Sequence, residues 1–274
     1  MEISIRKNHE LRMKAFDLLQ ELKSKNTNRK EIIDKLYSKF DIPKQNLYDW
    51  YSGRFYPYGR REELTHKPEL FYVLGALLGD GCAYYWKKLG RHLINLVGDQ
   101  EFTAKYAKTI SECTNRNPKP YLNAKRNFWY VNLGSVELYF LFKEIKGDLN
   151  KLQIMLEKEN YRINALKFIE GFFDAEGCVK IIKEKVRKTP KICLDITNTN
   201  FELLDLIRRL LKEHLDIEAK YSIQKADGIK NKKIAYHLRI YKKAFIKRFF
   251  ENINTTKLKK EKVTYVQNWL NNGK

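Results

Sequence analysis

The pattern of apolar residues divides the chain into a helical beginning and a mixed remainder. A first helix over about 8–24 is predicted by apolar residues at helical spacing, namely Leu11, Ala15, Leu18, Leu19 and Leu22. A second predicted helix begins after Asn28, and a third spans about 43–51 and ends before Gly53. Two short helices on either side of a turn at 40–42 are typical of a helix-turn-helix. A three-helix bundle that only packs is the alternative.

From Thr65 onward, stretches of strand-like alternation lie between helical stretches, and the same order of elements occurs twice. Each half is predicted to fold as α-β-β-α-β-β-α, which makes the fold class α+β. The predicted strands lie near 82–88, 91–97, 119–124 and 127–133, then near 178–186, 190–197, 217–225 and 232–240. We expect a small all-α domain over 1–66, repeats over 67–150 and 151–252, a connector within them at 147–162, and a basic helix in 253–274.

Two segments of the predicted repeats, 74–82 and 170–178, are versions of one another. They read LGALLGDGC and EGFFDAEGC, and every aligned pair is 96 positions apart. Gly75 and Gly79 of the first segment align with Gly171 and Ala175 of the second, four residues apart on one helical face. Glycine inside a helix costs about 1 kcal/mol relative to alanine. Close contact between two helices is the reason we infer for these small residues.

Each repeated segment has an acid directly before its final Gly-Cys pair, Asp80 in the first and Glu176 in the second. Two carboxylates held together at helix C-termini repel one another, and one pKa rises, unless a cation lies between them. A hard divalent ion with oxygen ligands, Mg2+ or Mn2+, fits such a position. The pattern therefore predicts a dinuclear or shared-metal site suited to phosphodiester hydrolysis.

Composition points to a polyanionic partner. The 274 residues include 54 Lys and Arg against 33 Asp and Glu, a formal charge of +21, and such an excess is typical of proteins that neutralise phosphates. The chain begins without a signal-peptide pattern, and its apolar runs are too short for a membrane span, so we expect a cytoplasmic protein without a membrane partner. Cys82 and Cys178 occupy matching repeat positions, where we expect small apolar residues at the start of a buried strand.

The paired segments resemble the two signature motifs of the LAGLIDADG homing endonucleases, in the single-chain, two-repeat form, over roughly 68–252. The resemblance implies a saddle of two four-stranded antiparallel sheets. It also implies a site-specific, Mg2+-dependent endonuclease that cuts both strands of DNA and leaves 3′ overhangs. We expect a monomer with pseudo-twofold symmetry and a long duplex target site, with intron RNA as a second candidate partner.

The resemblance assigns roles by position. Asp80 and Glu176 are the implied catalytic and metal-binding acids, the carbonyl groups of Gly79 and Ala175 are implied further ligands, and Gly75, Gly79, Gly171 and Ala175 are the implied helix interface. In the family, a polar or basic residue often lies at the end of the second strand of each repeat and orders water in the active site, and this chain has no lysine there. The candidates for ordering water are Asp99, Gln100, Asn198, Lys180 and Lys183, with helix capping as the alternative role of Asp99. Asp174, the additional acid of the second motif, is expected to cap or pair locally.

Basic and aromatic residues at the predicted third helix, the linker and the hairpins are candidates for DNA contact. In the first domain and linker they are Lys44, Gln45, Asn46, Tyr48, Arg54, Arg60 and Arg61. In the first repeat they are Tyr84, Trp86, Lys87, Lys88, Arg91, Lys125 and Arg126. In the second repeat they are Lys185, Arg187, Lys188, Lys191, Lys225, Lys230, Lys232, Lys233 and Arg239. The alternatives to cleavage are an RNA-splicing maturase, a DNA-binding regulator, or a basic RNA-binding protein without metal dependence.

Overall fold

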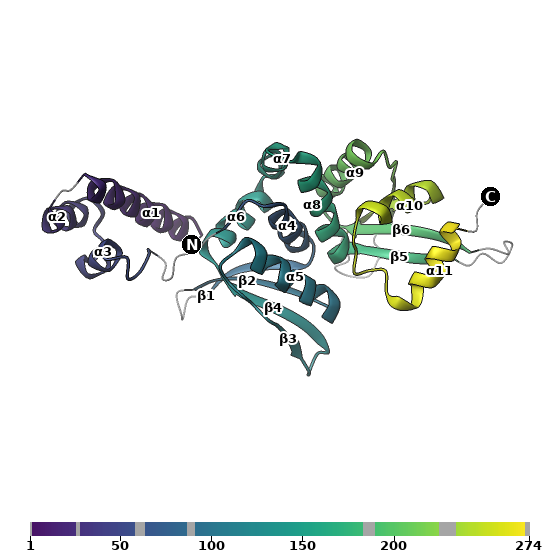
Figure 1. Cartoon of the computed structure of the whole chain (residues 1–274), viewed down its shortest axis with the longest axis horizontal. Coiled ribbons are helices and arrows are strands. Elements are labelled where there is room, and N and C mark those ends of the chain that lie inside the picture. The colour runs from purple at the N-terminus through teal and green to yellow at the C-terminus, as the bar shows by residue number, and fades with distance from the viewer. Residues whose placement is uncertain are drawn as a thin grey trace. The chain divides into compact units, whose positions relative to one another are not determined.

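The computed structural model describes residues 2–25, 28–57, 64–86, 91–182, 190–224 and 234–271. The chain divides into two compact units, Met1–Glu63 and Leu64–Lys274, whose elements are labelled in Figure 1. Each unit has a hydrophobic core of its own. No helix in the described part of the chain is both long enough and apolar enough for a membrane span.

The first unit is a bundle of three helices, α1 (Glu2–Ser24), α2 (Arg29–Phe40) and α3 (Lys44–Tyr51). Asn28 caps α2 by accepting a hydrogen bond from the amide of Lys30. Asp41 ends α2 with a positive φ of 50°, which reverses the chain before α3. The three helices enclose a core of Ala15, Leu19, Ile32, Ile33, Leu36, Ile42, Leu47 and Trp50.

The second unit contains two repeats of the same topology. The first consists of α4 (Pro68–Asp80), β1 (Gly81–Trp86), β2 (Arg91–Gly98), α5 (Gln100–Cys113), β3 (Pro120–Asn123), β4 (Phe128–Gly134) and α6 (Val136–Gly147). The second consists of α8 (Tyr161–Glu176), β5 (Gly177–Ile182), β6 (Lys191–Asn198), α9 (Phe201–Leu215), β7 (Lys220–Gln224), β8 (Ala235–Ile240) and α10 (Lys243–Asn252). The sheet orders, β1-β2-β4-β3 and β5-β6-β8-β7, correspond, and both sheets are antiparallel. The predicted α+β fold with two four-stranded sheets is confirmed.

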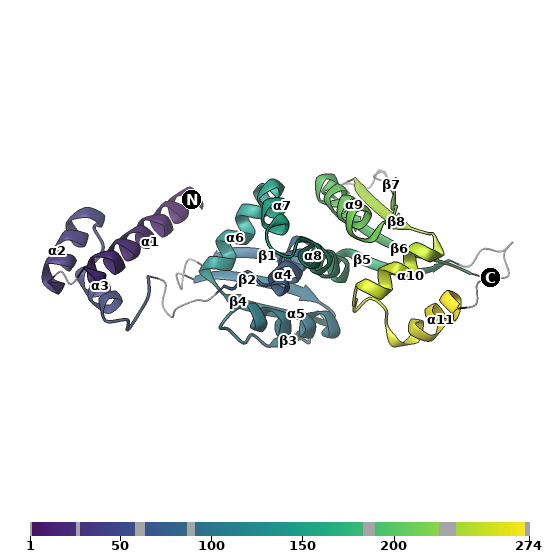
Figure 2. The same cartoon turned by 45° about the horizontal axis from the view of Figure 1, so that its top comes forward.

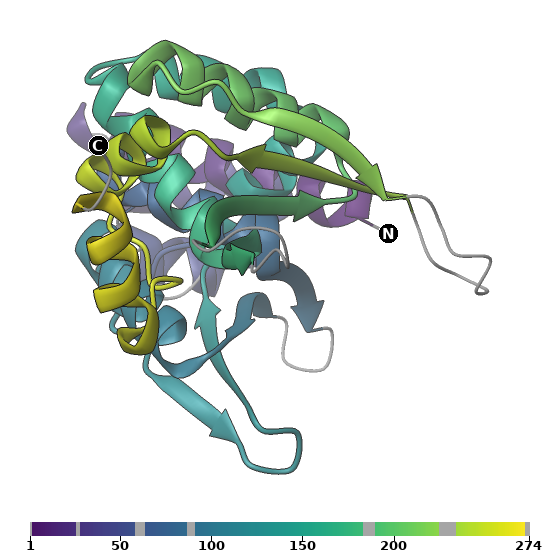
Figure 3. The same ribbon diagram turned by 90° about the vertical axis from the view of Figure 1, so that its right-hand side faces the viewer.

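Helices cover one face of each sheet (Figure 2), and the opposite face is called the open face below. Residues alternate between the faces, as in any strand. In β2, Ile94 and Leu96 are buried under the helices, whereas Asn95 lies on the open face beside Asn132 of β4. A further helix, α11 (Lys260–Asn271), follows the second repeat and lies next to α10 (Figure 3), where Lys243 covers the ring of Trp269.

Two expectations were wrong. The connector predicted over 147–162 contains helix α7 (Leu149–Glu157), capped by Asp148 and packed through Leu152 and Leu156. Its two buried leucines are about one helical turn apart, and a single spacing of this kind is too short a pattern to predict a helix from the sequence. Cys82 and Cys178 are exposed rather than buried. Each is the second residue of its strand and lies opposite a polar residue on the neighbouring strand, Asn95 or Asp195.

Helices α4 and α8 pack along their lengths at the centre of the second unit. At Gly171 of α8, an added Cβ would lie 2.0 Å from the carbonyl oxygen of Tyr72 in α4. At Gly75 of α4, an added Cβ would lie 2.3 Å from the carbonyl oxygen of Phe168 in α8. Because the backbones themselves are in contact, no side chain fits at either position.

We expect Gly171→Ala to lower the free energy of unfolding by about 2–3 kcal/mol or more, because its methyl group forces the two helices apart. Gly147→Ala at the end of α6 is the matched control, since nothing lies within 4 Å of the added Cβ. The control is expected to be neutral or to stabilise by up to about 1 kcal/mol. Urea denaturation measures both variants, and equal effects would contradict the tight helix contact.

Candidate active site

The two motif acids are the last residues of their helices. Asp80 ends α4 and Glu176 ends α8, and each chain turns directly into a strand at the following glycine. An added Cβ at Gly81 would lie 2.6 Å from the carbonyl oxygen of Leu77, and one at Gly177 would lie 2.4 Å from that of Phe173. The glycines therefore permit an abrupt exit that leaves each carboxylate at the helix end.

The close helix contact brings the two helix ends together. An added Cβ at Gly79 would lie 2.4 Å from the Cβ of Ala175 and 2.9 Å from the Cγ of Glu176. The last two residues of each helix therefore form one site, namely Gly79 and Asp80 of α4 with Ala175 and Glu176 of α8. Asp80 is exposed and Glu176 is half-buried, so the site is open to solvent.

The electrostatics of the site show that the carboxylates interact. Burial and then the neighbouring charge of Asp80 raise the pKa of Glu176 to about 7. Burial also raises the pKa of Asp80 above its usual value. The ammonium group of Lys257 acts in the opposite direction on the pKa of both carboxyl groups. Two carboxylates that resist ionising side by side gain from any cation placed between them.

Asn198 holds one of the carboxylates in place. Its Nδ2 donates a hydrogen bond of 2.8 Å to Oε1 of Glu176, and its Oδ1 accepts one from the amide of Asn200. Among the candidates for ordering water that lie in the described residues, only this side chain, at the end of β6, contacts a motif acid. Its hydrogen bond lowers the pKa of Glu176, partly offsetting the effects of burial and of Asp80.

The other candidates for ordering water have different partners. Asp99 caps α5 by accepting from the amide of Phe102, and its second oxygen lies 3.7 Å from Nζ of Lys259. Gln100 is the exposed first residue of α5. Lys180 pairs with the buried carboxylate of Asp195 on the open face. Lys183 lies outside the described residues.

Asp174 has long-range partners, so the expectation of a local cap or pair was wrong. Its side chain is completely buried, and it accepts hydrogen bonds from the Tyr72 hydroxyl (3.0 Å), Lys105 Nζ (2.8 Å), Thr255 Oγ1 (2.6 Å) and the Thr256 amide (2.8 Å). Lys105 also lies 2.7 Å from a carboxylate oxygen of the nearly buried Glu170. These partners come from α4, α5 and the segment after α10, and no sequence spacing relates them.

The open faces differ between the repeats at matching positions. In the first sheet, Asn95 donates to Asn132 across β2 and β4. In the second sheet the corresponding strands place Asp195 opposite Arg239, 3.3 Å apart. Asp195 also contacts Lys180 and the ring of His237. A neutral amide pair in one half is therefore replaced by an ion network in the other.

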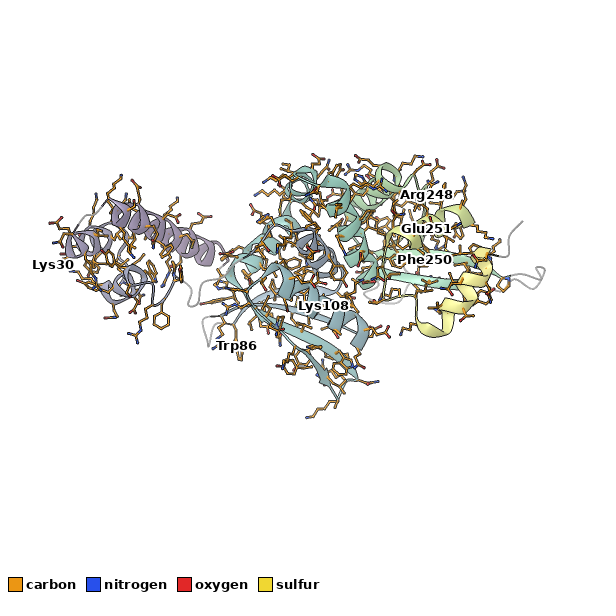
Figure 4. All side chains as sticks on the ribbon, viewed as in Figure 1. Lys30, Trp86, Lys108, Arg248, Phe250 and Glu251 are labelled. Atoms are coloured by element: carbon orange, nitrogen blue, oxygen red, sulfur yellow. The ribbon has the colours of Figure 1, made fainter. Side chains whose placement is uncertain are left out.

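Several candidates for DNA contact lie at the expected hairpins. Tyr84 and Trp86 are exposed in β1, with Trp86 at its end (Figure 4). Arg91 begins β2 and Lys191 begins β6, while Lys125 and Arg126 are exposed in the turn between β3 and β4. Arg239 lies within β8. The candidates outside the described residues are Arg60, Arg61, Lys87, Lys88, Lys185, Arg187, Lys188, Lys225, Lys230, Lys232 and Lys233.

In the first unit, three α3 candidates interact within the unit. Lys44 pairs with Asp34 at 2.6 Å, and Gln45 donates to Asp49. The ring of Tyr48 lies under the guanidinium of Arg29, 4.7 Å from its centroid. Asn46 is half-buried, and Arg54 follows α3 beside Phe55. Lys44 and Gln45 remain exposed, so their contacts are ones that a phosphate or base could replace.

Sequence inspection missed Lys257. It belongs to the polar run 254–257 after the last helix of the second repeat, a stretch with no periodicity and no counterpart in the first repeat. The contact with Asp174, 81 positions away, is what fixes this run near the helix ends. Only the folded arrangement reveals it.

Comparison with known proteins agrees with this architecture. Residues 164–254 match the model of a family described as LAGLIDADG-like domain. An uncharacterized protein of Methanocaldococcus jannaschii, MJ0398, is 26% identical over 268 residues, which is 92% of each chain.

Two solved structures are similar to this chain. The full-length DUF199/WhiA protein from Thermatoga maritima is 14% identical, with a TM-score of 0.50 over 76% of this chain and 61% of its own. The homing endonuclease I-DmoI, solved in complex with DNA and Ca, is 18% identical, with a TM-score of 0.49 over 73% of this chain and 97% of its own. The chain has the LAGLIDADG fold, as the two motifs predicted.

The raised pKa of Glu176 predicts a pH-dependent stability in the absence of metal. The folded protein binds the proton of Glu176 more tightly than the unfolded chain does, because the pKa of this carboxyl group is near 4.5 in the unfolded chain. The contribution of protonated Glu176 to folding stability is therefore complete below pH 4.5 and is lost as the pH rises through about 7. A glutamine cannot ionise, so Glu176→Gln does not lose this stability as the pH rises. In EDTA, the urea midpoint of Glu176→Gln should therefore increase relative to that of the wild type between about pH 5 and pH 8.

The control for this pH series is Glu202→Gln, at an exposed position in the first turn of α9. Its midpoint should keep a constant offset from the wild type over the same range. Parallel curves for Glu176→Gln and the wild type would show that the site does not perturb Glu176.

Proposed function

We propose that the protein is a site-specific endonuclease that hydrolyses phosphodiester bonds in both strands of DNA, uses a divalent metal and leaves 3′ overhangs. The observation that carries this proposal is the meeting of Asp80 and Glu176 at the ends of two helices whose backbones touch. Repelling carboxylates at an open position are costly for a fold unless they bind a cation. The high positive charge of the chain makes a nucleic acid the natural substrate.

The residues present fit a hard divalent cation. Among the described residues, no group of three or more His, Cys, Asp and Glu side chains could hold a metal ion, so water and substrate oxygens would have to complete the coordination that the two carboxylates begin. Mg2+ favours such sites, and Mn2+ accepts the same ligands. Asp80 and Glu176 would hold the ion, with the carbonyl groups of Gly79 and Ala175 as proposed further ligands. A bound ion would offset the charge that develops on the phosphate and acidify water at the site.

The protein's own groups prepare the site for this chemistry. Asn198 fixes one oxygen of Glu176 by its hydrogen bond and so orients the carboxylate. The ammonium group of Lys257 lowers the pKa of both acids and so offsets part of the repulsion between their ionised forms. The backbone contact between α4 and α8 fixes the spacing of the two acids, so little reorganisation is needed when substrate arrives.

The open faces of the two sheets are proposed to read duplex DNA. Amide and guanidinium groups, such as Asn132 and Arg239, suit the hydrogen-bonding edges of bases in the major groove. Basic residues at the turns, such as Lys125, suit phosphates. Since a single chain carries both repeats, the protein is proposed to act as a monomer on a long, asymmetric site.

The second candidate is a nucleic-acid-binding protein that does not cleave, either an RNA-splicing maturase or a DNA-binding regulator. Exposed rings on the first sheet, Tyr84, Trp86 and Tyr121, favour it because aromatic side chains on a sheet can stack on unpaired bases. Retention of both acids favours cleavage. Intron RNA is the partner that the maturase would require.

Cleavage of a randomised duplex-DNA library tests the proposal. We expect cuts at one long site with Mg2+ and none with EDTA. On the selected site, Asp80→Asn or Glu176→Gln should reduce the cleavage rate by at least about 1000-fold while changing DNA affinity by less than about threefold. Glu101→Gln, an exposed acid in the first turn of α5, is the control and should cleave normally. Unimpaired cutting by either motif variant would exclude that acid from the chemistry.

The three-helix unit is proposed to extend the DNA footprint. If it contacts phosphates, deletion of residues 1–63 should weaken binding to the selected site about tenfold at 0.1 M salt and reduce the salt slope by about two. Circular dichroism of the remaining chain checks that its separate core still folds. An unchanged salt slope would make the unit an appendage without a role in DNA binding.

A further inference from the structure

The segment after α10 joins both repeats. Residues 254–259, called the C-terminal strap below, contact α5 of the first repeat and α8 of the second. The carbonyl of Asn254 accepts from Lys105 of α5, and at the other end of the strap Lys259 reaches Asp99 at the start of α5. The strap therefore crosses the boundary between repeats beside the motif helices.

The middle of the strap is fixed by Asp174. One oxygen of this buried carboxylate accepts from both Thr255 Oγ1 and the amide of Thr256, at 2.6 and 2.8 Å. Thr255 Oγ1 in turn accepts from the amide of Lys257 at 3.0 Å. An uncompensated buried carboxylate is very costly, so these hydrogen bonds strongly specify the strap's conformation. Asp174 is two residues from Glu176, which ties the strap to the site itself.

The next residue in this arrangement is Lys257. Its backbone is held by Thr255, and its ammonium group lies 5.7 Å from the centre of the Phe102 ring, near the start of α5. From there its charge acts on both Asp80 and Glu176. Lys259, two residues on, pairs instead with Asp99 at the surface. The charge of one strap lysine therefore acts on the two acids, whereas the other lysine is paired with Asp99.

We propose that the C-terminal strap supplies the basic group of the cleavage site, Lys257, and that Asp174 and Thr255 are its positioning residues. This inference rests on the proposed endonuclease function. A phosphate held at the two acids would present oxygens to which this ammonium group could donate hydrogen bonds. Because it is a cation beside the two carboxylates, it also competes with a divalent ion for them.

Lys257→Met tests this role against Lys259→Met, which removes the same charge from the same strap. In single-turnover cleavage of the selected site, Lys257→Met should be at least about 100-fold slower than the wild type, with DNA affinity no weaker than that of Lys259→Met. Lys257→Arg, which keeps the charge, should recover most of the rate. Lys259→Met should cleave at nearly the wild-type rate.

Calorimetric titration of the metal-free full-length protein with Ca2+ provides a readout that does not depend on cleavage. Removal of a competing cation should make Lys257→Met bind Ca2+ about fivefold more tightly than the wild type, and Lys259→Met should not differ from the wild type. If Lys257→Met matched Lys259→Met in both Ca2+ affinity and cleavage, the inference would be overturned. A wild type that binds Ca2+ but cuts no DNA would contradict the proposed function alone, and the Ca2+ comparison would still decide the role of the strap.

The positioning role is separated from a structural one by combining variants. Thr255→Val removes two hydrogen bonds of the strap without leaving Asp174 unpaired, since Tyr72, Lys105 and the Thr256 amide remain. It should slow cleavage about tenfold in the wild type and have no further effect in Lys257→Met. Equal slowing in both backgrounds, with matched unfolding midpoints, would show that Thr255 does not act through Lys257.

Discussion

The architecture of residues 64–274 depends on direct backbone contact between helices α4 and α8. With no side chain at Gly75 or Gly171, the carbonyl oxygens of one helix lie against the α-carbons of the other. This spacing places both helix ends, and therefore Asp80 and Glu176, in one site. The same helices continue into the first strands of their sheets, so the contact also fixes how the two open faces are presented. A small change in helix separation would therefore alter the proposed cation site and the proposed DNA-reading faces together.

The elements and residues that repeat could be predicted from the sequence, because a periodic or duplicated pattern is visible at several positions of the chain. The two motifs, the order of strands and the capping role of Asp99 all follow from local spacing. The partners of Asp174 could not be predicted, since they come from three segments that only the fold brings together. The position of Lys257 near the acids could not be predicted either, because only the fold brings its segment close to the helix ends. Cys82 and Cys178 were placed on the wrong face because a single residue of register exchanges the faces of a strand.

The duplication is symmetric in its backbone and asymmetric in its chemistry. Where the first sheet has an amide pair, Asn95 with Asn132, the second has Asp195 surrounded by Arg239, Lys180 and His237. The strap adds a further asymmetry, because it contributes a lysine beside both acids but has one copy. If the open faces read DNA as proposed, a single chain with such faces could read two different half-sites, whereas a symmetric dimer would require a palindrome. The differences between the faces would then give the proposed endonuclease a defined orientation on its target.

Asp80 and Glu176 are proposed to form one divalent-cation site together. Electron paramagnetic resonance of Mn2+ added to the metal-free protein tests this proposal, because free and bound ions give distinct signals. We expect bound Mn2+ in the wild type and at least about tenfold weaker binding in both Asp80→Asn and Glu176→Gln, since each variant removes one of the two charged ligands. Equal Mn2+ binding by the wild type and both variants would contradict the shared site.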